Sequence, residues 1–584
     1  MKPKKSFSSK PQPKKSGAVH SKNANLRTPG SGNAKARSAK PPWPEKSNKD
    51  DKRPAGNSVS SKFAKSEFTR AERSEKPKWG AKASKTSKGG TFRSSFRDKT
   101  DDRQERPART GRPARRGRVS FYSPKTFKGA QSKDEEAQLS EGTVQRIALE
   151  ILNQFEETQD RADHLLQQSI HKNAKLLGAR EKGNLTKTVL NIVRWKLRID
   201  YIVSKSLKMD SESLETTLKS AYRLAAFNVV WMNKSAEKCI SLSDFAIPKE
   251  FGKYKETVRH FIKFLNKAKN DIPYPNPKKN LVNAISVTYS HPVWLVEKWL
   301  GIYGEQDVVK LCEFNNAEPP LTVRVNPIKA SVKEAIGGIE REGFQAAACQ
   351  YAEYGLNVTG RGEIFVTEGF KNGAFDIQDE SSQLFAAWCD PQPNHTVIDA
   401  CAGSGGKSLY FSASMNNKGK IIASDPNQRS LEKLSKRAAR AGSGNIEIVD
   451  LQNKEVADLW KDKADKVVID APCSGLGTLA RNPDIKWRFD PETFPQIVAE
   501  QISILNYFAS FVKKGGELIY GTCTLNPDEN EHVIRHFIAT DSRFEIRLDH
   551  PKKFVKFIDD KGFFYIQPFK QGLSGFFGCK MIRK

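Results

Sequence analysis

Cysteine is sparse in this chain, and long apolar runs are missing. Its 584 residues include eight cysteines, no two of them spaced as Cys-x-x-Cys, which excludes a disulfide-rich secreted scaffold and argues against a cysteine-rich zinc site. No apolar run reaches the roughly 18 residues that a membrane span needs. The basic N-terminus has no apolar stretch, so we do not expect a signal peptide. These absences predict a soluble protein of a reducing compartment, the cytoplasm.

Acidic residues are scarce at one end of the chain. The first 130 residues carry 36 Lys or Arg against 10 Asp or Glu, a net charge of +26, and the remainder contributes only +5 of the total of +31. Few aliphatic side chains accompany this charge, so residues 1–135 are predicted to be a disordered basic tail. A polyanionic partner is indicated, most commonly nucleic acid. The tail either binds single-stranded RNA through charge and isolated aromatic residues or only solubilises the protein.

The next segment, residues 141–270, is predicted to be an all-helical domain. Apolar residues recur at helical spacing from Val144 to Phe155, and further helices are expected from Leu185, over 214–232 and over 258–267. Several basic side chains on these helices either line an RNA-facing surface or are simply solvated: Arg146, Lys182, Lys187, Arg194 and Lys196.

Residues 271–304 are interpreted as a connector and residues 305–380 as a small α+β unit. Prolines at 273, 275 and 277 interrupt helices. A new helix is expected after Ser290, with Ser290 as its cap and Pro292 in its first turn. Strands are expected over 321–325 and 363–366, with a helix over 332–342.

From residue 381 to 584 the pattern is one of alternating strands and helices. Five short apolar runs begin near residues 395, 421, 446, 466 and 517, and four of them end in or next to an aspartate. This pattern is typical of an α/β fold with a mostly parallel, doubly wound, Rossmann-like sheet. Ligands of such folds bind at the carboxyl ends of the strands.

A glycine-rich loop follows the first of these strands. Residues 399–408 read Asp-Ala-Cys-Ala-Gly-Ser-Gly-Gly-Lys-Ser, and three glycines let the backbone approach a ligand closely at a helix N-terminus. A Walker phosphate loop would need glycine where Cys401 stands, and a dinucleotide loop would need a different glycine spacing. An adenosine-type ligand is compatible with this loop. Asp425, at the end of the next strand, is placed to meet its ribose hydroxyls.

Two cysteines follow the fourth and fifth strands. Cys473 lies in Asp-Ala-Pro-Cys-Ser-Gly-Leu-Gly, and Cys523 lies in Gly-Thr-Cys-Thr-Leu-Asn-Pro-Asp-Glu-Asn-Glu. Strands four and five of such a sheet are usually close at their carboxyl ends, so we expect both thiols to face one pocket and to act chemically. The cysteines at 239, 312, 349, 389 and 579 are interpreted as small buried apolar residues.

These motifs together resemble the Sun/Nop family of RNA cytosine-5 methyltransferases. Residues 399–408 resemble its cofactor loop, residues 470–477 and 521–531 its two cysteine motifs, and residues 141–270 the NusB-type RNA-binding domain of its bacterial small-subunit ribosomal RNA branch. One departure concerns the loop, where Gly403 and Ser404 replace the Ala and Pro of the family, so we expect a less rigid loop.

The resemblance implies methylation of C5 of a cytosine in RNA, with 16S ribosomal RNA as the expected substrate, through a covalent bond between a cysteine and C6. In the family, Cys523 is the nucleophile, Cys473 assists product release, and Asp470 hydrogen-bonds the cytosine ring. DNA cytosine methyltransferases use the Pro-Cys thiol as nucleophile, so the residues alone leave the two roles exchangeable. The implied cofactor is S-adenosylmethionine. Its implied contacts are Cys401, Ala402, Gly403, Ser404, Gly405, Gly406, Lys407, Asp425, Arg429, Asp450 and Asp470.

Three alternatives stay open at this point. The chain could act on transfer RNA, act on DNA, or be a non-catalytic RNA-binding factor of ribosome assembly. The helical domain and the second cysteine motif disfavour DNA, and the intact cysteine pair disfavours a non-catalytic role. We expect an RNA partner, no metal, no membrane and a monomer.

Overall fold

The structure is a computed structural model and describes residues 133–360 and 362–584. The basic tail predicted for residues 1–135 therefore lies almost wholly outside the described residues. Within the described ranges, no helix is both long and apolar enough to cross a bilayer.

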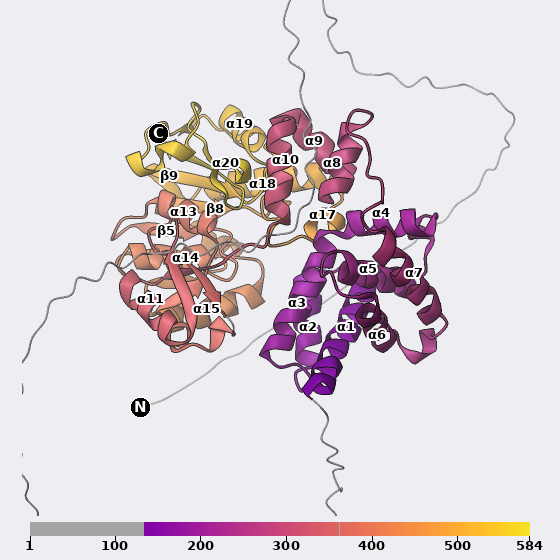
Figure 1. The fold of residues 1–584 in the computed structure, drawn as a ribbon. Coiled ribbons are helices and arrows are strands. Elements are labelled where there is room, and N and C mark those ends of the chain that lie inside the picture. The colour runs from indigo at the N-terminus through magenta and orange to yellow at the C-terminus, as the bar shows by residue number, and fades with distance from the viewer. Residues whose placement is uncertain (1–132, 361) are drawn as a thin grey trace, which may run out of the picture. The chain divides into compact units, whose positions relative to one another are not determined.

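Helices α1 to α7 form a bundle, drawn in the indigo-to-magenta part of the ribbon (Figure 1). One face of each helix is apolar, as in α7, where Val258, Phe261, Ile262 and Leu265 are buried at helical spacing. The buried faces meet in one core, so the all-helical prediction is confirmed. The bounds are Lys133–Thr158 (α1), Ala162–Lys172 (α2), Ala179–Arg194 (α3), Lys196–Leu207 (α4), Thr216–Val230 (α5), Ala236–Ala246 (α6) and Tyr254–Ala268 (α7).

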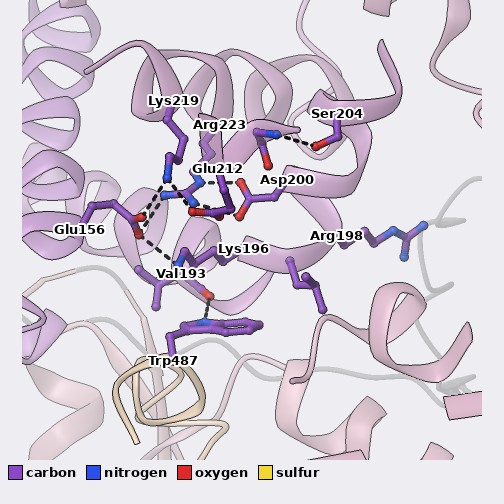
Figure 2. Close-up of polar contacts among 12 residues, drawn as sticks. Glu156, Val193, Lys196, Arg198, Asp200, Ser204, Glu212, Lys219, Arg223 and Trp487 are labelled. Carbon is purple, nitrogen blue, oxygen red and sulfur yellow. Dashed lines mark hydrogen bonds and ion pairs between the residues drawn. The ribbon is translucent and has the colours of Figure 1, made fainter. Parts of the chain in front are cut away.

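The bundle also buries a cluster of ion pairs where α1, α4 and α5 meet (Figure 2). Arg223 Nε and Nη2 donate to the two carboxylate oxygens of Asp200 at 2.6 and 2.9 Å, and Arg223 Nη1 lies 2.9 Å from Glu156. Lys196 and Lys219 lie 3.2 and 3.8 Å from the same glutamate. Burial opposes the charge of Arg223, but the two carboxylates outweigh it and raise its pKa. The buried charges are therefore balanced within the fold.

Residues 271–304 contain two helices, α8 (Leu281–Tyr289) and α9 (Val293–Tyr303), and α10 (Glu305–Asn316) follows. The prediction that Ser290 caps the second helix is wrong. Ser290 ends α8 with a φ of 55°, and Pro292 immediately precedes α9. The left-handed turn directs the Ser290 hydroxyl to α4, where it accepts a hydrogen bond from Leu197 N at 3.1 Å. A serine between two helices can cap the start of the second helix or end the first, and the local sequence does not distinguish the two cases.

The α+β unit is a four-stranded antiparallel sheet in the order β2-β3-β1-β4. The strand predicted over 363–366 is wrong: Ile364–Val366 is a short 3-10 helix. Ile364 alone is buried there, while Phe365 and Val366 are exposed, so this apolar run has no sheet face to cover. Sequence reasoning missed three of the four strands, β2, β3 and β4. The bounds are Leu321–Val325 (β1), Val332–Arg341 (α11), Phe344–Ala348 (β2), Gly355–Gly360 (β3), Glu368–Lys371 (α12) and Phe375–Ile377 (β4).

The large sheet has the order β10-β12-β9-β8-β5-β6-β7, with β11 paired to β12. Strands β5 to β9 run parallel, and β12 is antiparallel to β9. The predicted Rossmann-like fold is confirmed. The strand bounds are Thr396–Asp399 (β5), Lys420–Ala423 (β6), Ile446–Ile448 (β7), Ala464–Asp470 (β8), Val512–Thr522 (β9), Phe544–Ile546 (β10), Phe564–Ile566 (β11) and Phe576–Arg583 (β12).

Helices cover both faces of this sheet. Val397 and Val468 pack with α13 and α14, while Ile398 and Val467, their neighbours along each strand, pack with α18 and α19. This period of two explains the continuous apolar strands. The order reverses at β5, which has β6 on one side and β8 on the other, so a crevice opens at their carboxyl ends. The helix bounds are Glu380–Cys389 (α13), Gly406–Ser414 (α14), Gln428–Ala441 (α15), Lys454–Asp458 (α16), Ile485–Arg488 (α17), Phe494–Ala509 (α18), Glu531–Thr540 (α19) and Pro568–Gln571 (α20).

The segment after the first cysteine motif packs against the helical bundle. Lys486 Nζ donates to Arg194 O at 2.8 Å. Trp487 Nε1 donates to Val193 O at 2.6 Å, as Figure 2 shows. Arg194 Nη2 in turn donates to Ala480 O at 2.7 Å. These contacts fix the bundle beside the cysteine loops.

Each of the five basic residues expected to line an RNA-facing or solvated surface forms a hydrogen bond or an ion pair with another residue. Arg194 is 3% exposed, so that prediction is wrong for it. Lys196 contacts the largely buried Glu156. Lys182 and Lys187 pair with Glu363 and Glu318, which belong to other parts of the chain, and Arg146 pairs with Glu150 on its own helix.

Candidate active site

The two cysteine loops meet at the carboxyl ends of β8 and β9. Asp470 at the end of β8 pairs with Gly521 near the end of β9. Cys473 follows Asp470 by three residues and Cys523 follows Gly521 by two, and their Sγ atoms lie 3.5 Å apart. Both thiols line one cavity of about 520 Å³. The parallel pairing of the strands therefore brings together two residues that are 50 positions apart in the sequence.

The two thiols contact each other directly. The hydrogen bond with Cys523, together with burial, holds the pKa of the Cys473 thiol well above its ordinary value. Cys473 therefore keeps its proton at neutral pH, and either sulfur can donate the hydrogen bond between them.

The helical bundle supplies part of the cavity wall. Arg161, the residue before α2, lines the same cavity as the two thiols, and so do Arg488 and Phe489 from the segment after the first cysteine motif. Arg488 Nε donates to Gln159 O at 3.1 Å, which ties the two walls together. Arg161 and Phe489 were not identified from the sequence, because nothing in their local pattern points to a cavity formed by two distant segments.

The glycine-rich loop joins β5 to α14, as predicted. Gly403 and Gly405 have φ of 53° and 85°, in the left-handed region that favours glycine. A side chain at Gly405 would lie 2.6 Å from Leu434 Cγ of α15, so only glycine lets the loop pack there. At Gly403, nothing lies within 4 Å of the position of an added Cβ, so the space in front of the loop is open.

We expected this loop to be less rigid than a loop with proline. Side chains from β1 and α15 hold it by hydrogen bonds. Arg437 Nη1 donates to the carbonyl and the hydroxyl of Ser404 at 2.5 and 2.9 Å, and its Nε donates to Asp376 at 3.0 Å. Arg324 Nη1 donates to Gly406 O at 3.0 Å from β1. The α+β unit and α15 thus hold the loop that a proline would otherwise stiffen.

The predicted acidic residues lie at successive strand ends. Asp425, after β6, accepts hydrogen bonds from Gly403 N and Asn427 N, both at 2.8 Å. Asp470, at the end of β8, accepts from the ammonium of Lys407. Asp450, after β7, is exposed, and so is Arg429 on α15.

Lys407 lies buried between the cofactor loop and the cysteine loops. Its Nζ lies 5.7 and 5.4 Å from the ring centroids of Phe385 and Phe576. Burial opposes its charge, but the Asp470 carboxylate outweighs it and raises the pKa of Lys407. The pair joins the loop after β5 to the end of β8.

Sequence reasoning missed Asp399, the last residue of β5. Its carboxylate is 1% exposed and accepts a hydrogen bond from Ser408 Oγ at 2.6 Å. Burial raises its pKa to about 6. The signal was present, because Asp399 is one of the aspartates that end the predicted strands.

These residues fit S-adenosylmethionine. The loop exposes backbone near a helix N-terminus beside open space, and Asp425, Asp450 and Asp470 place carboxylates along the same edge. Carboxylates suit a ligand that carries ribose hydroxyls, a sulfonium and an ammonium group. Within the described residues, no cluster of three or more His, Cys, Asp or Glu side chains is arranged to hold a metal ion.

The fold and this edge define the class: a Rossmann-like methyltransferase that uses S-adenosylmethionine. The family model described as 16S rRNA methyltransferase RsmB/F matches residues 386–582. A ferredoxin-like domain of RsmF/B-like methyltransferases matches residues 291–364, and the NusB family matches residues 143–256.

Two curated relatives can be aligned with this chain, one of them over most of its length. The probable ribosomal RNA small subunit methyltransferase B of Bacillus subtilis is 31% identical over 449 residues, which are 76% of this chain and 99% of that protein. The probable ribosomal RNA small subunit methyltransferase B of Synechocystis is 38% identical over 253 residues, 43% of this chain and 56% of that protein. The chain belongs to the 16S rRNA methyltransferase RsmB/F family. The crystal structure of PH0851 shares the fold, with a TM-score of 0.64, 24% identity, and coverage of 76% of this chain and 99% of that one.

Proposed function

We propose that this protein methylates C5 of a cytosine in 16S ribosomal RNA, with Cys523 bonded covalently to C6 during the reaction. The observation that carries the proposal is the pair of thiols 3.5 Å apart, at the strand ends that adjoin the cofactor loop. The name of the Bacillus subtilis relative supports the small ribosomal subunit as the source of the RNA. A ribosomal substrate would place the reaction in the cytoplasm, and we propose that the protein acts as a monomer.

The chemistry needs an activated ring, because C5 of cytosine is a poor nucleophile. The Cys523 thiolate adds to C6, and the electrons of the C5–C6 double bond move toward C5. S-adenosylmethionine, when bound, would supply an electrophilic methyl carbon to C5, and its sulfur would keep the electron pair of the broken S–C bond and leave as a neutral thioether. A base then removes the C5 proton, and the electrons of that C–H bond re-form the double bond and expel the Cys523 thiolate.

The neighbouring residues have separate tasks in this scheme. Cys473, beside the sulfur that must leave, assists the release step. Asp470 hydrogen-bonds N3 or the exocyclic amine of the cytosine, and Lys407 holds this carboxylate in place. The loop residues 401–407 and the carboxylates of Asp425 and Asp450 bind the cofactor.

The cavity wall carries groups that can contact a nucleic acid. Arg161, which also pairs with Asp163, and Arg488 supply guanidinium groups for phosphates, and Phe489 supplies a ring for stacking against an unpaired base. The target cytosine reaches the thiols only when it is turned out of any helix. The N-terminal residues 1–132 carry much of the positive charge, and we propose that they add sequence-independent affinity for RNA.

The proposal is tested with the full chain, methyl-labelled S-adenosylmethionine and unmodified RNA transcripts. We expect label in transcribed 16S ribosomal RNA, recovered as 5-methylcytidine after nuclease digestion, and none in a pool of transfer RNA transcripts. Label in transfer RNA alone would show that transfer RNA, and not 16S ribosomal RNA, is the substrate. If neither RNA is labelled and calorimetry detects no cofactor binding at millimolar concentration, the chain is a non-catalytic RNA-binding factor instead.

A further inference from the structure

A fully buried carboxylate lies directly behind the two thiols. Glu529 is 0% exposed and ends the short 3-10 helix Pro527–Glu529, which lies within the second cysteine motif. Among the described residues, no Lys or Arg forms an ion pair with it. Burying an acidic group without a cation is costly, so the surrounding hydrogen bonds must compensate.

Both carboxylate oxygens of Glu529 are fully engaged by donors. Oε2 accepts from Ser474 N at 2.8 Å and from Gln501 Nε2 at 3.3 Å. Oε1 accepts from Ser474 Oγ at 2.6 Å, and from Thr524 Oγ1 and Asn526 Nδ2 at 3.2 Å each. Hydrogen bonds that involve a charged acceptor are among the stronger ones in proteins.

The donors form a closed ring that spans the two cysteine loops. Ser474 follows Cys473, Thr524 follows Cys523, and the two hydroxyl oxygens lie 2.7 Å apart. The three side chains of Ser474, Thr524 and Glu529 are called the carboxylate ring below. Since each hydroxyl belongs to the residue next to a thiol, the ring links the two cysteine loops.

We propose that Glu529 is a positioning residue, which holds the Cys473 and Cys523 loops at the separation that the covalent reaction needs. It does not line the thiol cavity, so it acts through Ser474 and Thr524. The role in methylation rests on the function proposed above, whereas the role in thiol spacing does not depend on it. A misplacement of about 1 Å can cost about a hundredfold in rate.

Glu529→Gln is the variant that tests this role, because it keeps the shape and changes only the acceptor set. An amide nitrogen in place of Oε2 would face the Ser474 N–H, and in place of Oε1 it would face the Asn526 amide. Either orientation sets donor against donor at Ser474 N or at the Asn526 amide, so the anchoring of the residue after Cys473 or of the residue three positions after Cys523 is weakened. Glu531→Gln is the matched control: Glu531 lies two residues away and bonds the hydroxyl of Tyr565 instead of the ring.

Thiol spacing is read without RNA, from the rate at which the oxidant diamide closes a Cys473–Cys523 disulfide. We expect Glu529→Gln to slow closure about tenfold, since loosened loops lower the effective concentration of one thiol near the other. Glu531→Gln should match the wild-type protein. Equal closure rates in all three proteins would overturn the proposal, whatever the methylation assay shows.

Methylation kinetics then separate positioning from RNA binding. We expect Glu529→Gln to lower kcat about a hundredfold and to leave KM for the 16S transcript within about threefold. An unchanged kcat, or a change in KM alone, would contradict the role of Glu529. If the wild-type protein itself transfers no methyl group, the proposed function fails, and the diamide result still decides the spacing role.

A second substitution tests the ring directly. Asn526→Asp in the Glu529→Gln background gives the new amide an acceptor and returns a negative charge to the site, so we expect at least about a tenfold recovery of kcat and of disulfide closure. No recovery would indicate general damage. If Glu529→Gln fails to fold, Thr524→Val removes one arm of the ring, and an unaltered closure rate in that variant would overturn the proposal.

Discussion

The helical bundle and the large sheet both bury charged groups, but they do so in different ways. In the bundle, Arg223 has two carboxylate partners, and Glu156 has further lysines around it, so charge is balanced far from any ligand. In the sheet, Asp399 is buried at a strand end with a hydroxyl instead of a cation as its direct partner, and its pKa rises to about 6. Balanced burial avoids the cost of an unpaired buried charge, whereas an unbalanced carboxylate at the open edge has a shifted pKa, as groups at functional sites often do.

The largest effect on activity, and the smallest on stability, is expected from changes to the two thiols at the sheet edge. We expect Cys523→Ala to lower methylation by about four orders of magnitude and to trap no complex, because addition to C6 needs the nucleophile. Cys473→Ala should still form the adduct but release it poorly, so a denaturant-resistant protein–RNA complex should accumulate on gels. Neither change should alter unfolding by urea appreciably.

Cys579→Ala is the control, because that buried thiol lies on β12 and does not line the thiol cavity. A trapped complex with Cys523→Ala and none with Cys473→Ala would exchange the two roles. Full activity in both variants would remove covalent catalysis from the mechanism.

The opposite result is expected in the helical bundle. Arg223→Met leaves Asp200 buried without its partner and should lower the free energy of unfolding by about 3–5 kcal/mol, measured by urea titration. At a temperature where the variant stays folded, kcat should be unchanged. Arg259→Met, which breaks a partly exposed pair with Asp244, should cost much less, because solvent screens that pair.

Replacing both partners, as Asp200→Leu with Arg223→Met, should recover most of that loss, since no unpaired charge then remains. If the double variant is as unstable as Arg223→Met alone, packing and not charge balance explains the cluster.

Asp399 provides a pH test of the sheet. Its folded-state pKa of about 6 lies above the ordinary 3.8, so the folded protein holds the proton more tightly. Its contribution to stability is therefore present below pH 4 and is lost as the pH rises through 6. The loss approaches about 3 kcal/mol at neutral pH.

We expect Asp399→Asn to remove this slope, because Ser408 Oγ can still donate to the amide oxygen. Urea titrations of both proteins without cofactor, at steps from pH 4 to pH 7, give the difference curve. Parallel stability curves for the two proteins would show that burial of Asp399 imposes no cost.

The smallest effect is expected where the two regions meet. Arg161→Glu places a negative charge on the bundle side of the thiol cavity and should raise KM for the 16S transcript about tenfold. The dependence of binding on salt should weaken by roughly one phosphate contact, and kcat at saturating RNA should not change. Arg259→Glu, on the same bundle but outside the cavity, serves as the control. Equal effects of the two substitutions would show that Arg161 does not contact the RNA.

Much of the large sheet and its candidate site was predictable because the relevant signals are local. Apolar runs that end in Asp399, Asp425 and Asp470 identify buried parallel strands and the edge at which they stop. Parallel neighbours end at the same edge, so the proximity of Cys473 and Cys523 followed from strand order alone. The roles of the two thiols did not follow, because two cysteines after similar strands carry no difference in their local pattern.

The sequence by itself determined the helical bundle, the Rossmann-like sheet and the loops that carry the chemistry, since the periods of apolar residues and the glycine positions act over a few neighbouring residues. Only the tertiary structure decided that Arg194 is buried, that Ser290 bonds α4, and that Glu529 links the residues after both cysteines. The physical reason is the same in each case. A hydrogen bond is satisfied by whichever partner the packed fold brings within about 3 Å, and sequence distance places no limit on that choice.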